Sequence, residues 1–322
     1  MLAVTANSFS EENPLSGLVV GERPEPEPRP GWVPITVKAA TLNHHDLWSL
    51  RGVGLRTEQL PRILGCDGAG IDPDGNEVII YPVVTSPEWI GNEMNDPGRT
   101  TFSEAIDGTL AEQVLVPTRN LVPKPAGMSW AAAANMAVAW LTSYRMLFTQ
   151  AQLQPGDVVL VQGAGGGVNS AVIQLGVAAG LRVWVTSRDA GRRERALQLG
   201  AEQVFESGAR LPEQVPAVID NVGAATWTHS INVLRAGGTL ITCGATTGES
   251  PEKMGLRKIF FRELRIQGSS SGTMQEMRSL VNMIEATGLE PVIDTELPLA
   301  RAREGFERLE RGDVFGKILL TC

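Results

Sequence analysis

The chain has 322 residues, of which 43% are hydrophobic and 20% charged, with three cysteines and a formal net charge of -8. Single hydrophobic cores stop growing near roughly 250 residues, so we expect two domains. The negative charge opposes nucleic acid and anionic membranes as partners, because both attract positively charged proteins. No stretch approaches the roughly 18 apolar residues of a membrane span, and neither a targeting segment nor a disulfide pattern is visible. We therefore expect a cytoplasmic protein without membrane contact.

The first part of the chain is predicted to be rich in short strands. Residues 15–120 alternate between apolar runs and clusters of Gly and Pro, and the clearest runs are 35–39, 77–81 and 111–117. Short alternating runs bounded by turn residues are typical of strands in a compact β domain.

The second part predicts a parallel sheet. An Ala-rich helical stretch begins at Ser129, and then strands and helices alternate. The strand segments are almost wholly apolar, as expected where both faces of a sheet are covered: 158–161, 183–185, 217–219 and 240–242. An amphipathic helix over 299–309 and a strand over 317–320 end the chain. We predict an α/β protein in which a doubly wound domain of residues 127–272 interrupts a β-rich domain of residues 1–126 and 273–322.

The strongest local signal is a glycine loop between a strand and a helix. Glycines in such a loop let the backbone approach a pyrophosphate, whose charge the helix N-terminus favours. The last position of the usual fingerprint is Asn169 instead of Gly, and a plain Gly-rich turn is the alternative. The predicted dinucleotide contacts are Gly163, Gly165, Gly166, Gly167 and Val168.

The end of the next strand predicts which dinucleotide is bound. An NAD site carries an acidic residue there, whereas this chain has Ser187 and Arg188. A hydroxyl and a guanidinium suit the 2′-phosphate of NADP, because Arg offers a charge-assisted fork. Arg193 is a further candidate, although Arg192 and Arg193 are equally typical of a solvated helix face.

Two more loops lie at the carboxyl ends of predicted parallel strands, where doubly wound sheets bind ligands. We expect them to contact the cofactor through Gly244, Ala245 and Thr246 in the first loop and Ser269 and Ser270 in the second.

Taken together, these motifs resemble the medium-chain dehydrogenase/reductase superfamily over nearly the whole chain. The matching segments are 37–46, 65–70, 107–112 and the glycine loop. The resemblance implies a GroES-like domain, a Rossmann domain and a nicotinamide cofactor.

The resemblance breaks at the catalytic zinc. In the zinc-dependent alcohol dehydrogenases of the family, the three ligand positions correspond here to Asn43, Cys66 and about Val138. Zinc requires three protein ligands from Cys, His or carboxylate, and this set supplies one. The lobe over 83–103, which carries the structural zinc in those enzymes, has no cysteine. We therefore expect no metal, the alternative being an atypical ligand set drawn from His44, His45, Cys66 and Asp67.

Asn at the first ligand position resembles the zinc-free quinone and enone reductases of the family. The resemblance implies that Asn43 donates its amide to the substrate oxygen or the nicotinamide ribose, that His44 contacts the pyrophosphate and that either His45 or water donates a proton. A loop Asn bonded to its own backbone and buried structural histidines are the alternatives. The resemblance also implies cofactor contacts from Thr142 and Lys317, for which a packing hydroxyl and a solvated lysine are the alternatives.

The leading hypothesis is therefore an NADPH-dependent, zinc-independent reductase of a small carbonyl, enone or quinone, paired into a homodimer as relatives commonly are. One alternative is a metal-dependent alcohol dehydrogenase using His45, Cys66 and Asp67. The other is a cofactor-binding protein with little catalysis, since a fold does not guarantee chemistry.

Overall fold

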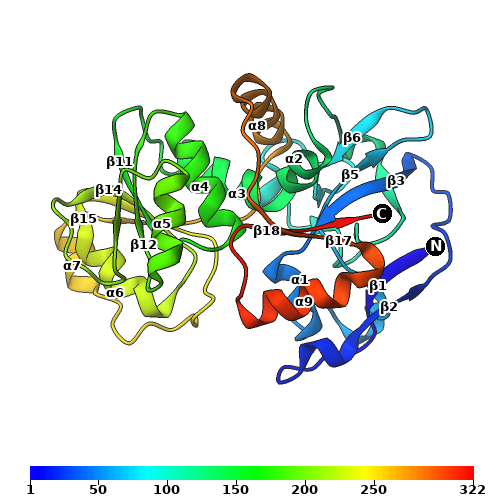
Figure 1. The fold of residues 1–322 in the computed structure, drawn as a ribbon, viewed down its shortest axis with the longest axis horizontal. Coiled ribbons are helices and arrows are strands. Elements are labelled where there is room, and N and C mark those ends of the chain that lie inside the picture. The colour runs from blue at the N-terminus through cyan, green and yellow to red at the C-terminus, as the bar shows by residue number, and fades with distance from the viewer. The chain divides into compact units, whose positions relative to one another are not determined.

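The computed structural model describes all 322 residues and divides into two compact units, 1–141 with 272–322 and 142–271 (Figure 1). The sequence suggested a first boundary at 126, fifteen residues earlier. The difference arises because helix α2 (Trp130–Asn135) packs against the strands β3 and β5 of the first unit. No helix is long and apolar enough to cross a membrane.

The first unit is built on a seven-stranded sheet in the order β10-β6-β5-β3-β18-β17, with β9 also paired to β3. The last strand, β18, pairs antiparallel with β3 and parallel with β17. A three-stranded sheet, β2-β1-β4, and the pair β7-β8 complete its strands. The strands are β1 (Leu2–Ala6), β2 (Leu18–Glu22), β3 (Trp32–Thr41), β4 (Arg62–Ile63), β5 (Asp67–Ile71), β6 (Glu77–Ile80), β7 (Val83–Val84), β8 (Thr100–Thr101), β9 (Gln113–Pro117), β10 (Leu121–Pro123), β17 (Ile293–Pro298) and β18 (Lys317–Thr321).

Helices of the first unit lie along and between these strands. The helix α9 packs against β17, β18 and α1, and its apolar face contributes to the core of the unit. The α-helices besides α2 are α1 (His44–Leu50), α8 (Met274–Thr287) and α9 (Ala302–Arg311). The short 3-10 helices are η1 (Pro14–Gly17), η2 (Thr57–Gln59), η3 (Glu93–Asn95), η4 (Thr118–Asn120) and η7 (Leu299–Arg301).

The Ala-rich stretch after Ser129 is helical as predicted but not a single α-helix. Two π-helical segments, η5 (Met136–Trp140) and η6 (Arg145–Gln150), lie on either side of the short helix α3 (Leu141–Tyr144). Such wide turns are rare inside helices and occur often at functional sites. The position equivalent to the third zinc ligand, Val138, lies in the first of them.

The second unit is a parallel six-stranded sheet, β13-β12-β11-β14-β15-β16. The strands are β11 (Val158–Gln162), β12 (Arg182–Thr186), β13 (Gln203–Phe205), β14 (Val215–Asp220), β15 (Leu234–Thr242) and β16 (Arg265–Gly268), and the helices in Figure 1 are α4 (Gly167–Ala178), α5 (Ala190–Gln198), α6 (Ala224–Val233) and α7 (Leu256–Phe261). The central strands are buried, with Leu160 and Leu240 fully inaccessible to solvent, as their uninterrupted apolar sequences predicted. The strand order reverses between β11 and β14, which is where doubly wound sheets bind dinucleotides.

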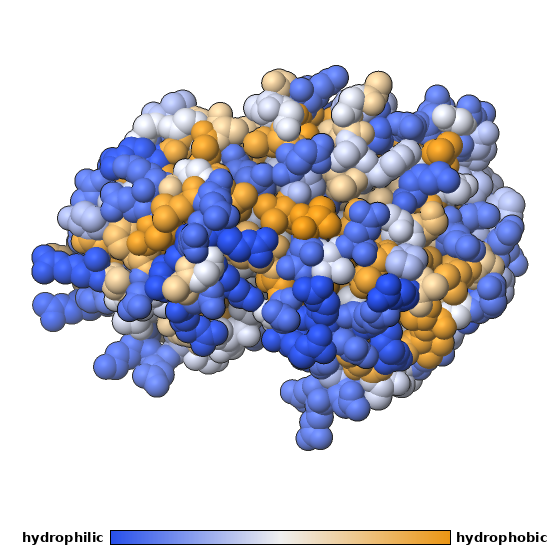
Figure 2. Space-filling view, viewed as in Figure 1, coloured by the Kyte–Doolittle hydropathy of each residue, from blue (hydrophilic) through white to orange (hydrophobic).

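Figure 2 shows a largely hydrophilic face with hydrophobic residues between the polar ones. In the second unit, large hydrophobic side chains are exposed before and within α7 and on the edge strand β16: Met254, Leu256, Phe260, Phe261 and Ile266.

Candidate active site

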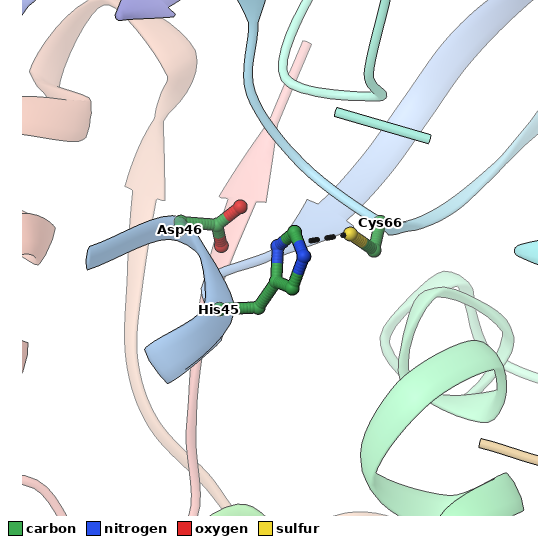
Figure 3. Close-up of side chains that lie close together, drawn as sticks. All are labelled: His45, Asp46 and Cys66. Carbon is green, nitrogen blue, oxygen red and sulfur yellow. Dashed lines mark hydrogen bonds between the residues drawn. The ribbon is translucent and has the colours of Figure 1, made fainter. Parts of the chain in front are cut away.

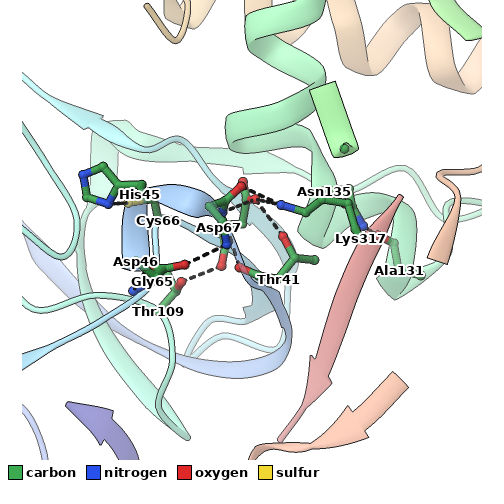
Figure 4. A network of polar contacts seen from close by, with 12 residues as sticks. Thr41, His45, Asp46, Gly65, Cys66, Asp67, Thr109, Ala131, Asn135 and Lys317 are labelled. Atoms are coloured by element: carbon green, nitrogen blue, oxygen red, sulfur yellow. Dashed lines mark hydrogen bonds and ion pairs between the residues drawn. The ribbon is translucent and has the colours of Figure 1, made fainter. Parts of the chain in front are cut away.

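A buried ion pair lies at the polar centre of the first unit. Lys317, the first residue of β18, donates from Nζ to Asn43 Oδ1 at 2.6 Å and to Asp67 Oδ2 at 3.2 Å (Figure 4). The Lys317 side chain is 5% exposed and that of Asp67 is fully buried. The solvated lysine considered from the sequence is therefore wrong. A buried charge needs a partner, and these two residues supply it to each other.

The Asn43 amide is fully engaged within this cluster. Its Nδ2 donates to Asp67 Oδ2 at 2.8 Å and to the Thr41 carbonyl at 3.4 Å, while its Oδ1 accepts from Lys317. The amide has two donor hydrogens, so none is left for a substrate oxygen in this arrangement. The predicted donor role of Asn43 would require one of these bonds to break, and it stays a prediction.

Asp46 fixes the start of helix α1. Its Oδ2 accepts from the Asn43 backbone amide at 2.8 Å and its Oδ1 from the Gly65 amide at 3.0 Å. Burial raises the pKa of Asp46, although nearby His45 and these amide bonds oppose the shift. Both carboxylate oxygens thus bind the backbone on either side of the site.

His45 lies between a thiol and a carboxylate. Its Nδ1 is 3.4 Å from Cys66 Sγ (Figure 3). Its Nε2 is 3.1 Å from Glu104 Oε1. The Cys66 sulfur in turn donates to the Phe102 carbonyl at 3.1 Å. The His45 side chain is 28% exposed and that of Glu104 33% exposed, so solvent reaches both groups. Sequence reasoning missed Glu104, which lies 59 residues from His45 in an unremarkable turn.

The environment favours the charged form of His45 and the neutral form of Cys66. Interaction with the Cys66 sulfur, followed by hydrogen bonds to Cys66 and Glu104, raises the pKa of His45 well above its ordinary value despite the opposing effect of burial. Burial raises the pKa of the Cys66 thiol, against the influence of His45. The two groups are coupled, because a charge on either one stabilises the opposite charge on the other.

His44 differs from its neighbour. Loss of hydration, then the positive charges of Lys317 and Arg51, lower the pKa of His44, so the ring is neutral at pH 7. A neutral imidazole still has one N–H to donate to a phosphate oxygen. His44 can therefore make the predicted contact with the pyrophosphate as an uncharged hydrogen-bond donor.

The donor atoms do not fit the zinc site of the family. Lys317 already presents its ammonium to Asn43 Oδ1, the nearest donor at the first ligand position. His45, Asp46 and Cys66 have ligand atoms within 4.8 Å of one another, but both Asp46 oxygens accept backbone amides. Asp67 Oδ2 accepts the Lys317 ammonium, and Asp67 Oδ1, which is buried without a hydrogen-bond partner, is not part of that cluster. Three free ligands around an open position are not present among these residues.

In the second unit, the glycine loop has the geometry that the sequence predicted. Gly163 has a φ of 86°, which suits glycine, and Gly166 caps helix α4. A Cβ on Gly165 would lie 2.6 Å from the Arg192 guanidinium, so this arginine lies directly over the loop. Gly167 and Val168 form the first turn of α4, with their amides at the helix N-terminus.

Asn169 replaces the last glycine of the fingerprint for a structural reason. Its Nδ2 donates to the carbonyls of Gln162 and Gly163 at 2.7 and 2.9 Å, and its Oδ1 accepts from Asn221 Nδ2 at 2.9 Å. The side chain thus ties the glycine loop to the loop after β14.

Ser187 and Arg188 directly follow β12, as predicted. Ser187 Oγ accepts from the Asp189 amide at 3.2 Å, and Arg188 is exposed. Arg193 donates to the Ser187 carbonyl at 2.6 Å and lies 3.7 Å from Glu206, so it holds the turn rather than standing free as a solvated side chain. Its predicted contact with the cofactor stays untested.

The remaining predicted cofactor residues occupy the carboxyl ends of strands in this unit. Gly244, Ala245 and Thr246 follow β15. Ala245 packs closely against Gly223, since a Cβ on residue 223 would lie 2.8 Å from the Ala245 backbone. After β16, the hydroxyls of Ser269 and Ser271 are buried without a hydrogen-bond partner, while Ser270 is exposed. Thr142 is buried in α3. Unpaired buried hydroxyls are uncommon, and here they are donors available to a ligand.

Family profiles match both parts of the chain. The alcohol dehydrogenase GroES-like domain matches residues 29–126, and the zinc-binding dehydrogenase profile matches residues 167–286. A solved NAD-dependent alcohol dehydrogenase is 32% identical, with a TM-score of 0.92 and complete coverage of both chains.

Two curated relatives are reductases. The acryloyl-coenzyme A reductase of Sulfurisphaera tokodaii is 27% identical over 95% of this chain and 97% of its own length. The mouse quinone oxidoreductase is 27% identical over 92% of this chain and 90% of its own length.

Proposed function

The chain belongs to the zinc-type alcohol dehydrogenase-like proteins of the medium-chain dehydrogenase/reductase superfamily and is an oxidoreductase, and from that premise we propose that it is an NADPH-dependent, zinc-independent reductase of small enones, quinones or related carbonyl compounds. The observation that carries the proposal is a site in which Asn43 and Cys66 fill two of the zinc ligand positions, with His45 between Cys66 Sγ at 3.4 Å and Glu104 Oε1 at 3.1 Å. An activated double bond is already polarised and can accept a hydride without a Lewis acid, whereas oxidation of a simple alcohol needs help to remove its proton.

The choice of NADP is supported by Ser187 and Arg188. A solved relative is called NAD-dependent, so family membership alone leaves the dinucleotide open. Here no carboxylate occupies the end of β12, and an exposed arginine stands beside a serine hydroxyl. A 2′-phosphate would be repelled by an acid at that position and attracted by a guanidinium.

The glycine loop, Arg192 and the unpaired Ser269 hydroxyl fit a dinucleotide. The Arg192 guanidinium lies against Gly165, 2.6 Å from where a Cβ would be, and brings a positive charge to the glycine loop. We expect contacts to the phosphates from Gly163, Gly166, Gly167 and Val168. We expect contacts to the rest of the cofactor from Arg193, Gly244, Ala245, Thr246, Ser270 and Thr142. When bound, NADPH supplies the hydride.

In the first unit His45 is the proposed proton donor. Its ring is partly exposed, and its surroundings raise its pKa well above the ordinary value, which favours the protonated form that a general acid requires. Lys317 orients Asn43, which would act on the substrate oxygen only after releasing Thr41 or Asp67. His44 would donate its single N–H to the pyrophosphate.

Turnover of a substrate panel tests the function. Purified protein is incubated with NADPH or NADH and a set of quinones, enones and enoyl thioesters, and oxidation of the cofactor is followed at 340 nm. We expect turnover of at least one activated alkene or quinone, preference for NADPH, no stoichiometric zinc by elemental analysis and full activity after chelation. Loss of activity on chelation would favour the alcohol dehydrogenase alternative, and tight cofactor binding without any turnover would favour the cofactor-binding protein.

We also propose that the chain forms homodimers in the cytoplasm. The outer edge of β16 has no partner strand, and Phe260 and Phe261, at the end of the preceding helix α7, are 70% and 81% exposed. Exposed sheet edges with apolar neighbours pair readily with another copy. The three cysteines are free, which fits a reducing compartment. Sedimentation of the native protein and of a Phe260→Ser/Phe261→Ser variant tests the dimer, and a native monomer at micromolar concentration would contradict it.

A further inference from the structure

We propose that Gln162 is a positioning residue for the cofactor site, which holds the end of β12 so that Ser187 and Arg188 can meet the 2′-phosphate of NADPH. The side chain of Gln162 is fully buried at the end of β11, directly before the glycine loop. The positioning follows from hydrogen bonds within the second unit. Its use in choosing the dinucleotide rests on the proposed function.

Three neighbouring parallel strands end in polar residues at the same register. Gln162 of β11 is paired with Thr186 of β12 on one side and with Asp220 of β14 on the other. Register partners in a parallel sheet project from the same face, so the three side chains form one polar row. Each is the last residue of its strand, and the glycine loop, the turn that carries Arg188 and the turn that begins at Asn221 follow. Three loops of the predicted cofactor site therefore start from this row.

Helix α6 covers the polar row with polar side chains of its own. Thr226, His229 and Ser230 have the spacing that places residues on one face of a helix. Gln162 Nε2 donates to His229 Nδ1 at 2.8 Å and to Ser230 Oγ at 3.0 Å. Gln162 Oε1 accepts from Thr186 Oγ1 at 2.6 Å. One amide on β11 therefore ties β12 to α6.

The hydrogens of this network have one consistent arrangement, because both of its ends are groups that only accept. Ser230 Oγ donates to the Asp220 carboxylate at 2.7 Å, so its oxygen receives a hydrogen from the Gln162 amide nitrogen. The second amide hydrogen points at His229 Nδ1, which must accept it. The hydrogen of that ring is on Nε2, which lies 2.8 Å from the Ala209 carbonyl. A flipped amide would set Gln162 Oε1 against Ser230 with no hydrogen between the two oxygens.

The network fixes the backbone that carries Arg188. Thr186 is held by the Gln162 amide, and the next residue, Ser187, donates its backbone N–H to the Phe205 carbonyl at 3.0 Å. A fully paired buried network is rigid, because each bond has a preferred length and direction that an apolar contact lacks. Apolar side chains of the same shape would be at least as easy to bury. What the polar row adds is therefore a fixed geometry at the start of the loops.

Thr186→Val tests the link, because it removes the hydroxyl from the end of β12 with little change of shape. We expect the Kd for NADPH to rise about fivefold or more, since the charge-assisted contact of Arg188 with the phosphate loses its geometry, and the Kd for NADH to rise less than about twofold. Both are measured by fluorescence titration. In cofactor-free protein, amide hydrogen exchange followed by mass spectrometry should accelerate over residues 186–193.

Thr226→Val is the matched control, with the same replacement in the same network. Thr226 Oγ1 donates to Asp220 Oδ2 at 2.8 Å, at the end of the network away from β12. We expect this variant to lower the urea midpoint, as Thr186→Val does, while the ratio of the two Kd values and the exchange over 186–193 stay as in native protein. A merely structural network would change both variants alike, and that result would overturn the positioning role of Gln162.

The outcomes separate the positioning from its use. Unchanged exchange over 186–193 in Thr186→Val would overturn the positioning, and faster exchange with an unchanged ratio of Kd values would overturn its use in choosing the dinucleotide. Native protein that binds NADH more tightly than NADPH would refute the proposed function, while exchange would still decide the positioning.

Native protein gives a further test that holds even where Thr186→Val fails to fold. The long-range ¹H–¹⁵N signals of His229 are identified by their loss in His229→Gln and show which ring nitrogen carries the hydrogen. A hydrogen on Nε2 alone supports the network, and a hydrogen on Nδ1 would overturn it.

Discussion

Asn221 donates a hydrogen bond to Asn169 at 2.9 Å across the point where the strand order of the parallel sheet reverses. Two loops that would cradle a dinucleotide are thus joined by side chains, where the usual fingerprint has a glycine. The conformation of the glycine loop depends on Asn169, because the same side chain also binds the carbonyls of Gln162 and Gly163.

Asn169→Ala should therefore weaken NADPH binding. The substitution removes all three hydrogen bonds from a side chain that is 5% exposed, and each is worth about 1 kcal/mol. We expect roughly a tenfold higher Kd by NADPH fluorescence and a lower urea midpoint. Asn221→Ala removes only one of the three bonds and should show a smaller effect. Equal Kd values for native and Asn169→Ala protein would contradict this role.

Arg188→Ser should reduce the preference for NADPH. A charge-assisted hydrogen bond to the 2′-phosphate is worth about 1.5–3 kcal/mol, so kcat/KM with NADPH should fall at least about tenfold while that with NADH changes little. Arg235→Ser is the matched control. This exposed arginine lies near the amino end of β15, whereas the glycine loop lies at the carboxyl ends of the strands. An unchanged ratio of the two kcat/KM values in Arg188→Ser would remove the argument for NADP.

Lys317→Met should destabilise the protein strongly. The variant leaves the Asp67 carboxylate fully buried without a cation, and breaking such a pair typically costs about 3–5 kcal/mol of unfolding free energy. The double variant Lys317→Met/Asp67→Asn should recover part of that loss, since no charge is then stranded. Urea unfolding of the native, single and double variants measures the coupling, and strictly additive losses would show that the ion pair is unimportant.

The His45–Glu104 pair should make stability depend on pH at both ends. The pKa of His45 is raised, so its contribution is complete below 6.5 and disappears as pH rises through the folded value. The pKa of Glu104 is lowered, so its contribution is present above 4.5 and disappears as pH falls through the folded value. Urea midpoints of native protein and His45→Gln should therefore differ most at intermediate pH and converge at high pH. A constant difference up to pH 10 would rule out a titrating His45.

Local patterns predicted the second unit well. The apolar runs that became β11, β12, β14 and β15 were visible because a strand covered on both faces needs no alternation. The glycine loop was predictable because its strand, turn and helix are consecutive. The clamp by Asn169 was not, since the polar partner Asn221 lies 52 residues further along the chain.

Less of the first unit could be predicted from the sequence. Asn43, His45 and Lys317 were identified as site residues through family resemblance, but their partners follow from tertiary packing. The sequence suggested that Lys317 is solvated or faces the cofactor. In the structure it is buried against Asn43, which lies 274 residues earlier in the chain. Glu104 carried no motif, because a carboxylate acting through a histidine needs only proximity. The π-helical turns within 129–150 have the same composition as an ordinary helix, so no pattern distinguished them.

The position of β18 between β3 and β17 has a consequence for how the protein is made. During synthesis Asn43 and Asp67 leave the ribosome long before Lys317, and so does the entire second unit, 142–271. The second unit draws its sheet from one continuous stretch and can close while the chain is still growing. The first unit cannot bury Asp67 together with its countercharge until β18 is delivered. We therefore expect the inserted unit to mature first, and the active-site half of the protein to be the part that depends on chaperones and proteases during its wait.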